Sequence, residues 1–295
     1  MKKSKIALGL LALGLMALIP ISSSSEAGQP QTSITLSADN LLVLNAQVDG
    51  ESVSELVAKA KKLDNELSSP MNKLKGGKSK HIILFLNTPG GSIQSGMELI
   101  EALNGLNHKV DTVTLFAASM GFQIVQSLND RLILKSGVLM SHQAQGEFAG
   151  YFGGTAPSQV DSRYKLWLDR VREFDEQTVS RTNGKQTYKS YTEAYNHELW
   201  LTGTQSVAQG YADRTVTVSC DSSLSGTTTH SAEFMGMQLL YDLDACPLNT
   251  SPLNVRAKPG AEGGITITSS TTEEIKKKFL EQFQNKKQQA LPFTW

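Results

Sequence analysis

The chain has 295 residues, 39% of them hydrophobic, and its 28 basic and 28 acidic side chains balance at pH 7. This composition is ordinary for a globular enzyme, and without a basic patch interleaved with aromatic residues it argues against a nucleic-acid partner. The sequence contains no P-loop, no His-Glu-x-x-His pair and no carboxylate array suited to Mg²⁺, so we expect no cofactor and no metal site.

Residues 1–27 have the pattern of a secretory signal peptide. Lysines near the start precede a mostly apolar stretch over residues 6–21, and Ser25 and Ala27 are small residues suited to a cleavage site. The stretch is short of the roughly 20 residues that a spanning helix needs, so an uncleaved membrane anchor is the weaker alternative. We therefore expect cleavage near Gly28, no membrane span afterwards, and a periplasmic or secreted protein.

Strands and helices then alternate along the chain, which predicts an α/β fold with repeated βαβ turns. Apolar runs predict strands over residues 33–36, 41–48, 81–86, 110–116 and 131–134. Apolar residues at helical spacing predict helices over residues 53–67, 92–106 and 121–128. Residues 69–80 are rich in lysine and glycine, and this composition indicates a solvated loop.

Three predicted strands are each followed by a segment with its own chemistry. Ser119 lies between small residues in Ala-Ala-Ser-Met-Gly, which suits a sharp strand-to-helix turn with an exposed hydroxyl. The Gly90-Gly91 pair can bring its backbone close to a substrate carbonyl, and His142 is the natural base. Each fragment alone could be an ordinary turn, a helix start or a structural histidine. Their succession at three strand ends favours an acyl-transfer site.

These segments resemble those of the proteolytic subunit of the Clp protease, in the Clp-protease/crotonase superfamily. The matching text is Asn87-Thr-Pro-Gly-Gly91, Ala117-Ala-Ser-Met-Gly121 and Met140-Ser-His-Gln143, within residues 35–215 that resemble the family. The resemblance implies repeated ββα units with a long projecting helix, and a serine endopeptidase acting on peptide or protein substrates.

The resemblance also assigns roles to individual residues. Ser119 is then the nucleophile and His142 the general base, and the amides of Gly91 and Met120 form the oxyanion hole. An extended peptide substrate would add to the strand edge formed by residues 90–92, which are Gly90, Gly91 and Ser92.

The third member of the catalytic triad departs from the family, which has an aspartate two residues before the aromatic residue of a Phe-Leu-Ser-Ala-like stretch. The corresponding stretch here begins at Trp200, so Glu198 takes that position, with Glu193 and Asn196 as nearby alternatives. A glutamate can orient a histidine because the imidazole NH needs only an acceptor. The competing interpretation of Glu198 is a solvated surface carboxylate.

Three other functions remain open from the sequence. A signal-peptide-peptidase-like enzyme would use a lysine base, for which Lys165 is a candidate, whereas a crotonase-like acyl-CoA enzyme would need no nucleophile. A catalytically degenerate binding or assembly protein is the non-enzymatic alternative. Export argues for an ATP-independent peptidase and against an ATP-driven unfoldase partner, because ATP is scarce outside the cytoplasm.

A long charged helix is predicted over residues 158–182, approached by residues 149–154. One side of it is apolar, with Val160, Tyr164, Trp167, Val171 and Phe174. In the Clp protease proteolytic subunit, which the chain resembles, the equivalent helix projects and interlocks two rings of subunits. The resemblance therefore implies a homo-oligomer.

Residues 216–295 form a carboxyl-terminal extension beyond the peptidase domain, which we place at residues 28–215. The extension contains Cys220 and Cys246, which we expect to form a disulfide in an oxidising compartment, two unpaired thiols being the alternative. Strands are predicted over residues 215–219 and 265–268, and a helix over residues 273–287. No role is assigned to the glycosylation sequon at Asn249.

Overall fold

The computed structural model describes residues 32–70, 81–145, 157–234, 237–249 and 252–257, and the single residues 274, 277, 278 and 281. The predicted signal peptide, the approach at residues 149–154, and the strand at residues 265–268 lie outside the described residues. The same holds for most of the loop at residues 69–80 and of the helix at residues 273–287.

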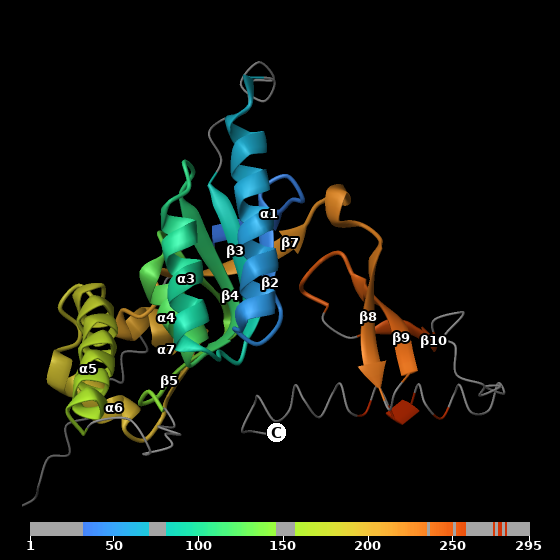
Figure 1. Cartoon of the computed structure of the whole chain (residues 1–295). Coiled ribbons are helices and arrows are strands. Elements are labelled where there is room, and N and C mark those ends of the chain that lie inside the picture. The colour runs from blue at the N-terminus through green and yellow to red at the C-terminus, as the bar shows by residue number, and fades with distance from the viewer. Residues whose placement is uncertain are drawn as a thin grey trace, which may run out of the picture. The chain divides into compact units, whose positions relative to one another are not determined.

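A seven-stranded sheet forms the centre of the fold (Figure 1), with the order β1-β7-β5-β4-β3-β2 and with β6 paired to β5. The pairs on this path are parallel, and only β6 runs antiparallel to its neighbour. The strands are β1 Thr32–Leu36, β2 Leu41–Leu44, β3 Ile82–Thr88, β4 Val110–Ala118, β5 Arg131–Ser141, β6 Leu199–Thr202 and β7 Arg214–Cys220. A mostly parallel sheet with helical crossovers confirms the predicted α/β fold.

The helices are α1 Gly50–Ser68, α3 Ile93–Asn104, α4 Met120–Ser127, α5 Pro157–Ser180, α6 Tyr188–Tyr195 and α7 Gly203–Gln209. Capping determines where several of them begin: Asp49 and Ser52 form a capping box before α1, and Thr187 and Ser190 form one before α6. The three helices predicted from apolar spacing and the long charged helix predicted over residues 158–182 are confirmed as α1, α3, α4 and α5. The short helices α6 and α7 and strand β6 were not predicted, because each is too short for a periodic apolar pattern.

Alternation of side chains along the central strands produces a core on each face of the sheet. On β3, Leu84 and Leu86 belong to one buried cluster and Phe85 to the other. The larger cluster includes apolar residues of α1, α3, α4 and α6, and α1 and α3 pack against each other (Figure 1). These helices place the ends of β3, β4 and β5 at one edge of a rigid core.

Two arginines, the buried Arg131 and the half-buried Arg181, connect the ends of several elements. Arg131, with a side chain only 2% exposed, forms an ion pair with Asp213 and also donates to the Gln126 side chain and the Arg181 carbonyl. Arg181, just after α5, donates to the carbonyls of Leu128 and Asn129 beyond the end of α4. The carboxyl-terminal end of α5 is thereby fixed against α4 and β5.

The boundary expected at residue 215 falls inside β7, which is part of the main sheet. Beyond β7, the short 3₁₀ helix η1 Ser222–Leu224 precedes a separate three-stranded antiparallel sheet of β8 Thr227–Phe234, β9 Met237–Asp244 and β10 Leu253–Ala257. This sheet was not predicted, because its first strand is mostly polar.

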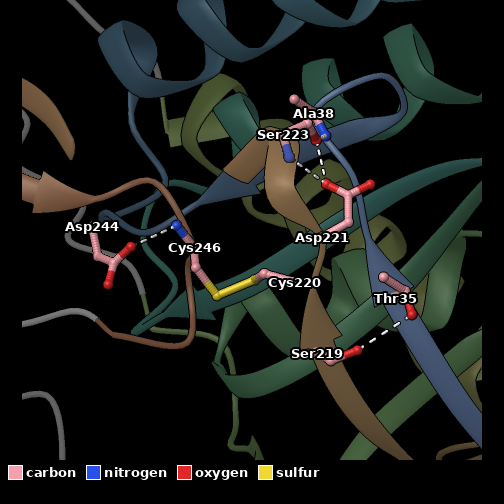
Figure 2. The surroundings of a disulfide bond; sticks show 8 residues. All are labelled: Thr35, Ala38, Ser219, Cys220, Asp221, Ser223, Asp244 and Cys246. Atoms are coloured by element: carbon pink, nitrogen blue, oxygen red, sulfur yellow. Dashed lines mark hydrogen bonds between the residues drawn. A yellow bond between two sulfur atoms is a disulfide. The ribbon is translucent and has the colours of Figure 1, made fainter. Parts of the chain in front are cut away.

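A disulfide joins Cys220 at the end of β7 to Cys246 after β9 (Figure 2), as the sequence predicts. Around it, Asp221 accepts a hydrogen bond from the Ser223 amide, and Asp244 accepts one from the Cys246 amide. None of the helices within the described ranges is long and apolar enough to cross a membrane.

Candidate active site

Ser119 occupies a sharp turn between the end of β4 at Ala118 and the start of α4 at Met120. Its backbone has φ 55° and ψ −121°, a left-handed conformation that is rare for a residue with a side chain. Ser119 is the N-cap residue of α4, yet its hydroxyl makes no capping hydrogen bond. The turn therefore holds a strained serine whose hydroxyl is available for other chemistry, and such strain is typical of functional sites.

His142 directly follows β5 and approaches this hydroxyl. Its Nε2 atom lies 2.8 Å from Oγ of Ser119, within hydrogen-bond distance. The two residues meet because Ala118 on β4 pairs with Met140 on the parallel strand β5, so both strands end side by side. The end of β5 is held in turn by a 2.8 Å hydrogen bond between the hydroxyls of Ser141 and the buried Tyr191.

The two glycines lie against the serine turn with φ 89° at Gly90 and φ 146° at Gly91. A Cβ on Gly90 would lie 2.8 Å from the Met120 nitrogen, so only glycine lets the two backbones approach this closely. Val48 donates to the Gly90 carbonyl and accepts from the Ser92 amide. Within the described part of the chain, no hydrogen bond uses the amide of Gly91 or Met120. Both amides are thus free to donate to a ligand.

One pocket of about 210 Å³ contains these groups. Gly91, Ser119, Met120 and His142 line one part of it, and side chains from α5 and α6 line another. Ser92, also expected to contact substrate, uses its hydroxyl to cap α3 by accepting from the Ser95 amide. Among the described residues, no three His, Cys, Asp or Glu side chains gather in a way that could hold a metal ion.

Glu198 lies next to His142 in the register of the sheet, because Ser141 on β5 pairs with Leu199 on β6. Its backbone is also left-handed, with φ 61°. Its carboxylate, however, accepts a 3.0 Å hydrogen bond from Nε1 of Trp200, and none joins it to His142. The sheet thus brings Glu198 beside the histidine without a direct side-chain bond.

None of the alternative catalytic residues considered from the sequence, which are Glu193 and Asn196 in place of Glu198 and Lys165 in place of His142, lines the pocket. Glu193 forms an exposed ion pair with Lys189 at 3.8 Å, and Asn196 is the C-cap residue of α6. Lys165 is exposed on α5 and does not line the pocket.

Asp175 on α5 and Tyr195 on α6 line the same pocket and were not singled out from the sequence. Asp175 is only 3% exposed and accepts a 2.7 Å hydrogen bond from the Tyr195 hydroxyl. Burial raises the pKa of Asp175 to about 6, although the hydrogen bond from Tyr195 acts in the opposite direction. The sequence contains a pattern that marks Asp175 as unusual. It follows Val171 by four residues and so lies on the apolar side of the predicted helix.

The sequence profile of the Clp protease family matches residues 29–219, which is more than half of the chain. The chain belongs to the Clp protease family. The match covers the whole seven-stranded sheet except Cys220, the last residue of β7, and leaves the separate three-stranded sheet outside the family region.

Several relatives support this membership. The ATP-dependent Clp protease proteolytic subunit 2 of Tropheryma whipplei is 33% identical over 156 residues, covering 52% of this chain and 83% of the relative. The proteolytic subunits of Streptococcus gordonii and Streptococcus agalactiae are 27% and 26% identical over 178 residues, covering 59% of this chain and 83% of each relative. Proteins of the Clp protease family are serine peptidases that form homo-oligomers and bind protein substrates.

Proposed function

We propose that this chain is a serine endopeptidase that works outside the cytoplasm without ATP, with Ser119 as nucleophile and His142 as general base. The observation that carries the proposal is the 2.8 Å approach of His142 Nε2 to the hydroxyl of a serine held in a left-handed turn. A serine becomes a nucleophile at neutral pH only when a neighbouring base can take its proton.

In the proposed reaction, Ser119 Oγ attacks the substrate carbonyl carbon while His142 takes the hydroxyl proton. His142 then gives that proton to the leaving amine as the peptide bond breaks, and water releases the acyl group from the serine. The amides of Gly91 and Met120 stabilise the oxyanion, and one such donor is typically worth about 3 kcal/mol in the transition state.

The substrate in this proposal is an extended peptide lying along Gly90, Gly91 and Ser92. The parallel bridge between Val48 and Gly91 uses the Gly90 carbonyl and the Ser92 amide, so the backbone groups of Gly91 face away from Val48. Because the Gly91 amide is assigned to the oxyanion, the edge offers the Gly91 carbonyl as an acceptor for the backbone of a peptide strand, as in β-augmentation.

Glu198 is the residue we propose to orient His142. Its place beside His142 in the sheet register and its left-handed backbone support this role. In the structure its carboxylate accepts from Trp200, so the role requires the carboxylate to exchange that donor for the imidazole NH.

Export and ATP independence are supported by the sequence and by the extension. The signal-peptide pattern of residues 1–27 directs the chain out of the cytoplasm, and the Cys220–Cys246 disulfide suits an oxidising compartment. A Clp-family peptidase in that compartment has no ATP supply for an unfoldase partner. We expect the amino terminus of the protein recovered from the periplasm or medium to lie near Gly28.

Self-association is part of the proposal because α5 presents apolar side chains to solvent. Tyr164, Leu166 and Leu168 are between 43% and 58% exposed along its first half. A helix with such a surface is stabilised when a second copy covers it.

Labelling with a fluorophosphonate probe, followed by mapping of the adduct, tests the peptidase proposal. Ser119 should be labelled in the unaltered protein and lose the label in Ser119→Ala and in His142→Ala, whereas exposed His197→Ala should keep it. Glu198→Gln should slow labelling if Glu198 orients the histidine. Absence of labelling in every oligomeric state would contradict the proposal and favour a catalytically degenerate binding protein.

A further inference from the structure

The pocket beside Ser119 contains a buried carboxylate that the proposed mechanism does not use. Asp175 lies on α5, lines the pocket together with Phe174 and Val171 of the same helix, and is only 3% exposed. The proposed nucleophile and base, Ser119 and His142, line the same pocket. A buried acid therefore lines the pocket that contains the proposed catalytic serine.

This carboxylate has no cationic partner in the described part of the chain. The Tyr195 hydroxyl donates to it at 2.7 Å, and Tyr188 is a second, neutral hydrogen-bonding neighbour. No lysine, arginine or histidine in the described residues forms an ion pair with it. The neighbouring Glu176 adds a second negative charge, and this repulsion contributes with burial to the raised pKa of Asp175. Buried charges in proteins are normally paired, so a buried acid without a counter-ion is disfavoured unless a ligand supplies the positive charge.

The remaining walls of the pocket suit the stem of a long basic side chain. Ile93, Val171 and Phe174 contribute apolar surface, which matches the methylene chain of lysine or arginine. The charged end of such a side chain could then pair with the carboxylate, as occurs in other serine peptidases whose pocket holds an aspartate.

We infer that Asp175 is a specificity-determining residue that makes this pocket prefer peptides with lysine or arginine as the acyl-side residue, the one whose carbonyl Ser119 attacks. This inference rests on the proposed peptidase function. Glutamate or aspartate in the same substrate position is disfavoured, because the pocket would then bring two negative charges together.

Two matched variants separate charge from structure. Asp175→Asn removes the negative charge and leaves an amide oxygen that can still accept from Tyr195. Glu176→Gln removes the same charge from the next residue of α5, which is exposed and does not line the pocket. Folding of both variants is checked by thermal unfolding.

The test uses fluorogenic peptides that differ only in the acyl-side residue, which is lysine, arginine, leucine or glutamate. Peptidyl phosphonate probes with lysine or leucine in that position measure the same preference through the rate of Ser119 labelling, even where turnover is slow. For the unaltered protein and Glu176→Gln we expect kcat/KM and labelling rates at least about tenfold higher for lysine than for leucine. In Asp175→Asn, kcat/KM and labelling rates should fall at least about tenfold for lysine and arginine but stay the same for leucine. A fall of this size is expected when a charged hydrogen bond is lost.

Each other outcome contradicts a specific statement. Equal or higher rates for leucine in the unaltered protein overturn the specificity inference and leave the peptidase proposal intact. If kcat/KM of Asp175→Asn falls equally for all four peptides, Asp175 does not determine specificity and instead supports the catalytic groups. Failure of both phosphonates and a general fluorophosphonate to label Ser119 contradicts the proposed function itself.

Discussion

Gly90 lies so close to Met120 that a Cβ on the glycine would be 2.8 Å from the Met120 nitrogen. The same Cβ would also lie 2.4 Å from the Ala118 carbonyl oxygen, on the strand that leads to Ser119. The approach of the glycine segment to the serine turn thus depends on a residue without a side chain.

Gly90→Ala should therefore reduce fluorophosphonate labelling of Ser119 by at least about tenfold, because displaced oxyanion donors typically cost that much or more. Its φ of 89° adds conformational strain for alanine. Gly50→Ala is the control, since a Cβ there meets nothing within 4 Å. Labelling rates and thermal unfolding of both variants check the prediction, and normal labelling of Gly90→Ala would contradict the proposed geometry.

Asp213→Ala should destabilise the fold by about 3 kcal/mol, because it leaves the guanidinium of Arg131 buried without its ion-pair partner. The Arg131 side chain is 2% exposed and lies 2.6 Å from the Asp213 carboxylate. Asp130→Ala breaks the exposed pair with Arg214 and should cost less than about 1 kcal/mol. Urea unfolding of the two variants measures the difference. Equal decreases in unfolding free energy would contradict the statement that the buried ion pair stabilises the fold more than the exposed one.

The effect of Asp213→Ala should also depend on pH. Burial alone would raise the pKa of Asp213, but hydrogen bonds and the charge of Arg131 outweigh it and hold that pKa below its ordinary value. The stabilisation is therefore present above the unfolded-state pKa of about 4 and is lost as pH falls below it. Unfolding free energies measured from pH 7 to pH 3 should show the variant and the unaltered protein converging at the acid end.

The proposed preference for lysine over leucine peptides should also depend on pH, through Asp175. Because its pKa is raised to about 6, the carboxylate is charged above that pH and neutral below it. The ratio of kcat/KM for lysine to leucine peptides should then fall about tenfold between pH 8 and pH 5. The ratio cancels the titration of the catalytic groups, which is common to both peptides.

The titratable groups near Asp175 that could modify this profile are Glu176 on α5, Tyr188, Tyr191 and Tyr195 on α6, and His142 after β5. Asp175→Asn serves as the control. It lacks the titrating carboxylate, so its ratio of kcat/KM for lysine to leucine peptides should not change between pH 8 and pH 5. A pH-independent ratio in the unaltered protein would show that Asp175 does not contact the substrate side chain.

Reduction of the disulfide should destabilise the extension without abolishing the active site. Cys220 and Cys246 are 26 residues apart, and closing a loop of that size is typically worth about 3 kcal/mol. Replacing both cysteines with serine should lower the unfolding temperature while Ser119 remains reactive toward a fluorophosphonate. A reducing agent should have no further effect on the double variant, and loss of Ser119 labelling would show that the extension supports the site.

The sequence predicted the parallel strands and the four helices that position the site, because each has a local apolar pattern of sufficient length. It did not predict α6, α7 and β6, although α6 supplies Tyr191, which hydrogen-bonds Ser141 just before His142, and Tyr195, which lines the pocket. These elements are short and mainly stabilised by tertiary packing, so no local pattern marks them. The same limit applies to the polar strand β8 of the extension.

The sequence by itself determined which residues carry complementary chemistry, because small residues around Ser119, a glycine pair and a histidine each leave a local signature. Only the tertiary structure decided how close these residues come, since the 2.8 Å between Ser119 and His142 depends on two parallel strands ending side by side. It also decided the environment of the acids: Glu198 bonds to Trp200, while Asp175 is buried beside the pocket. Distances and burial depend on contacts between residues far apart in the chain, and local sequence patterns do not specify them.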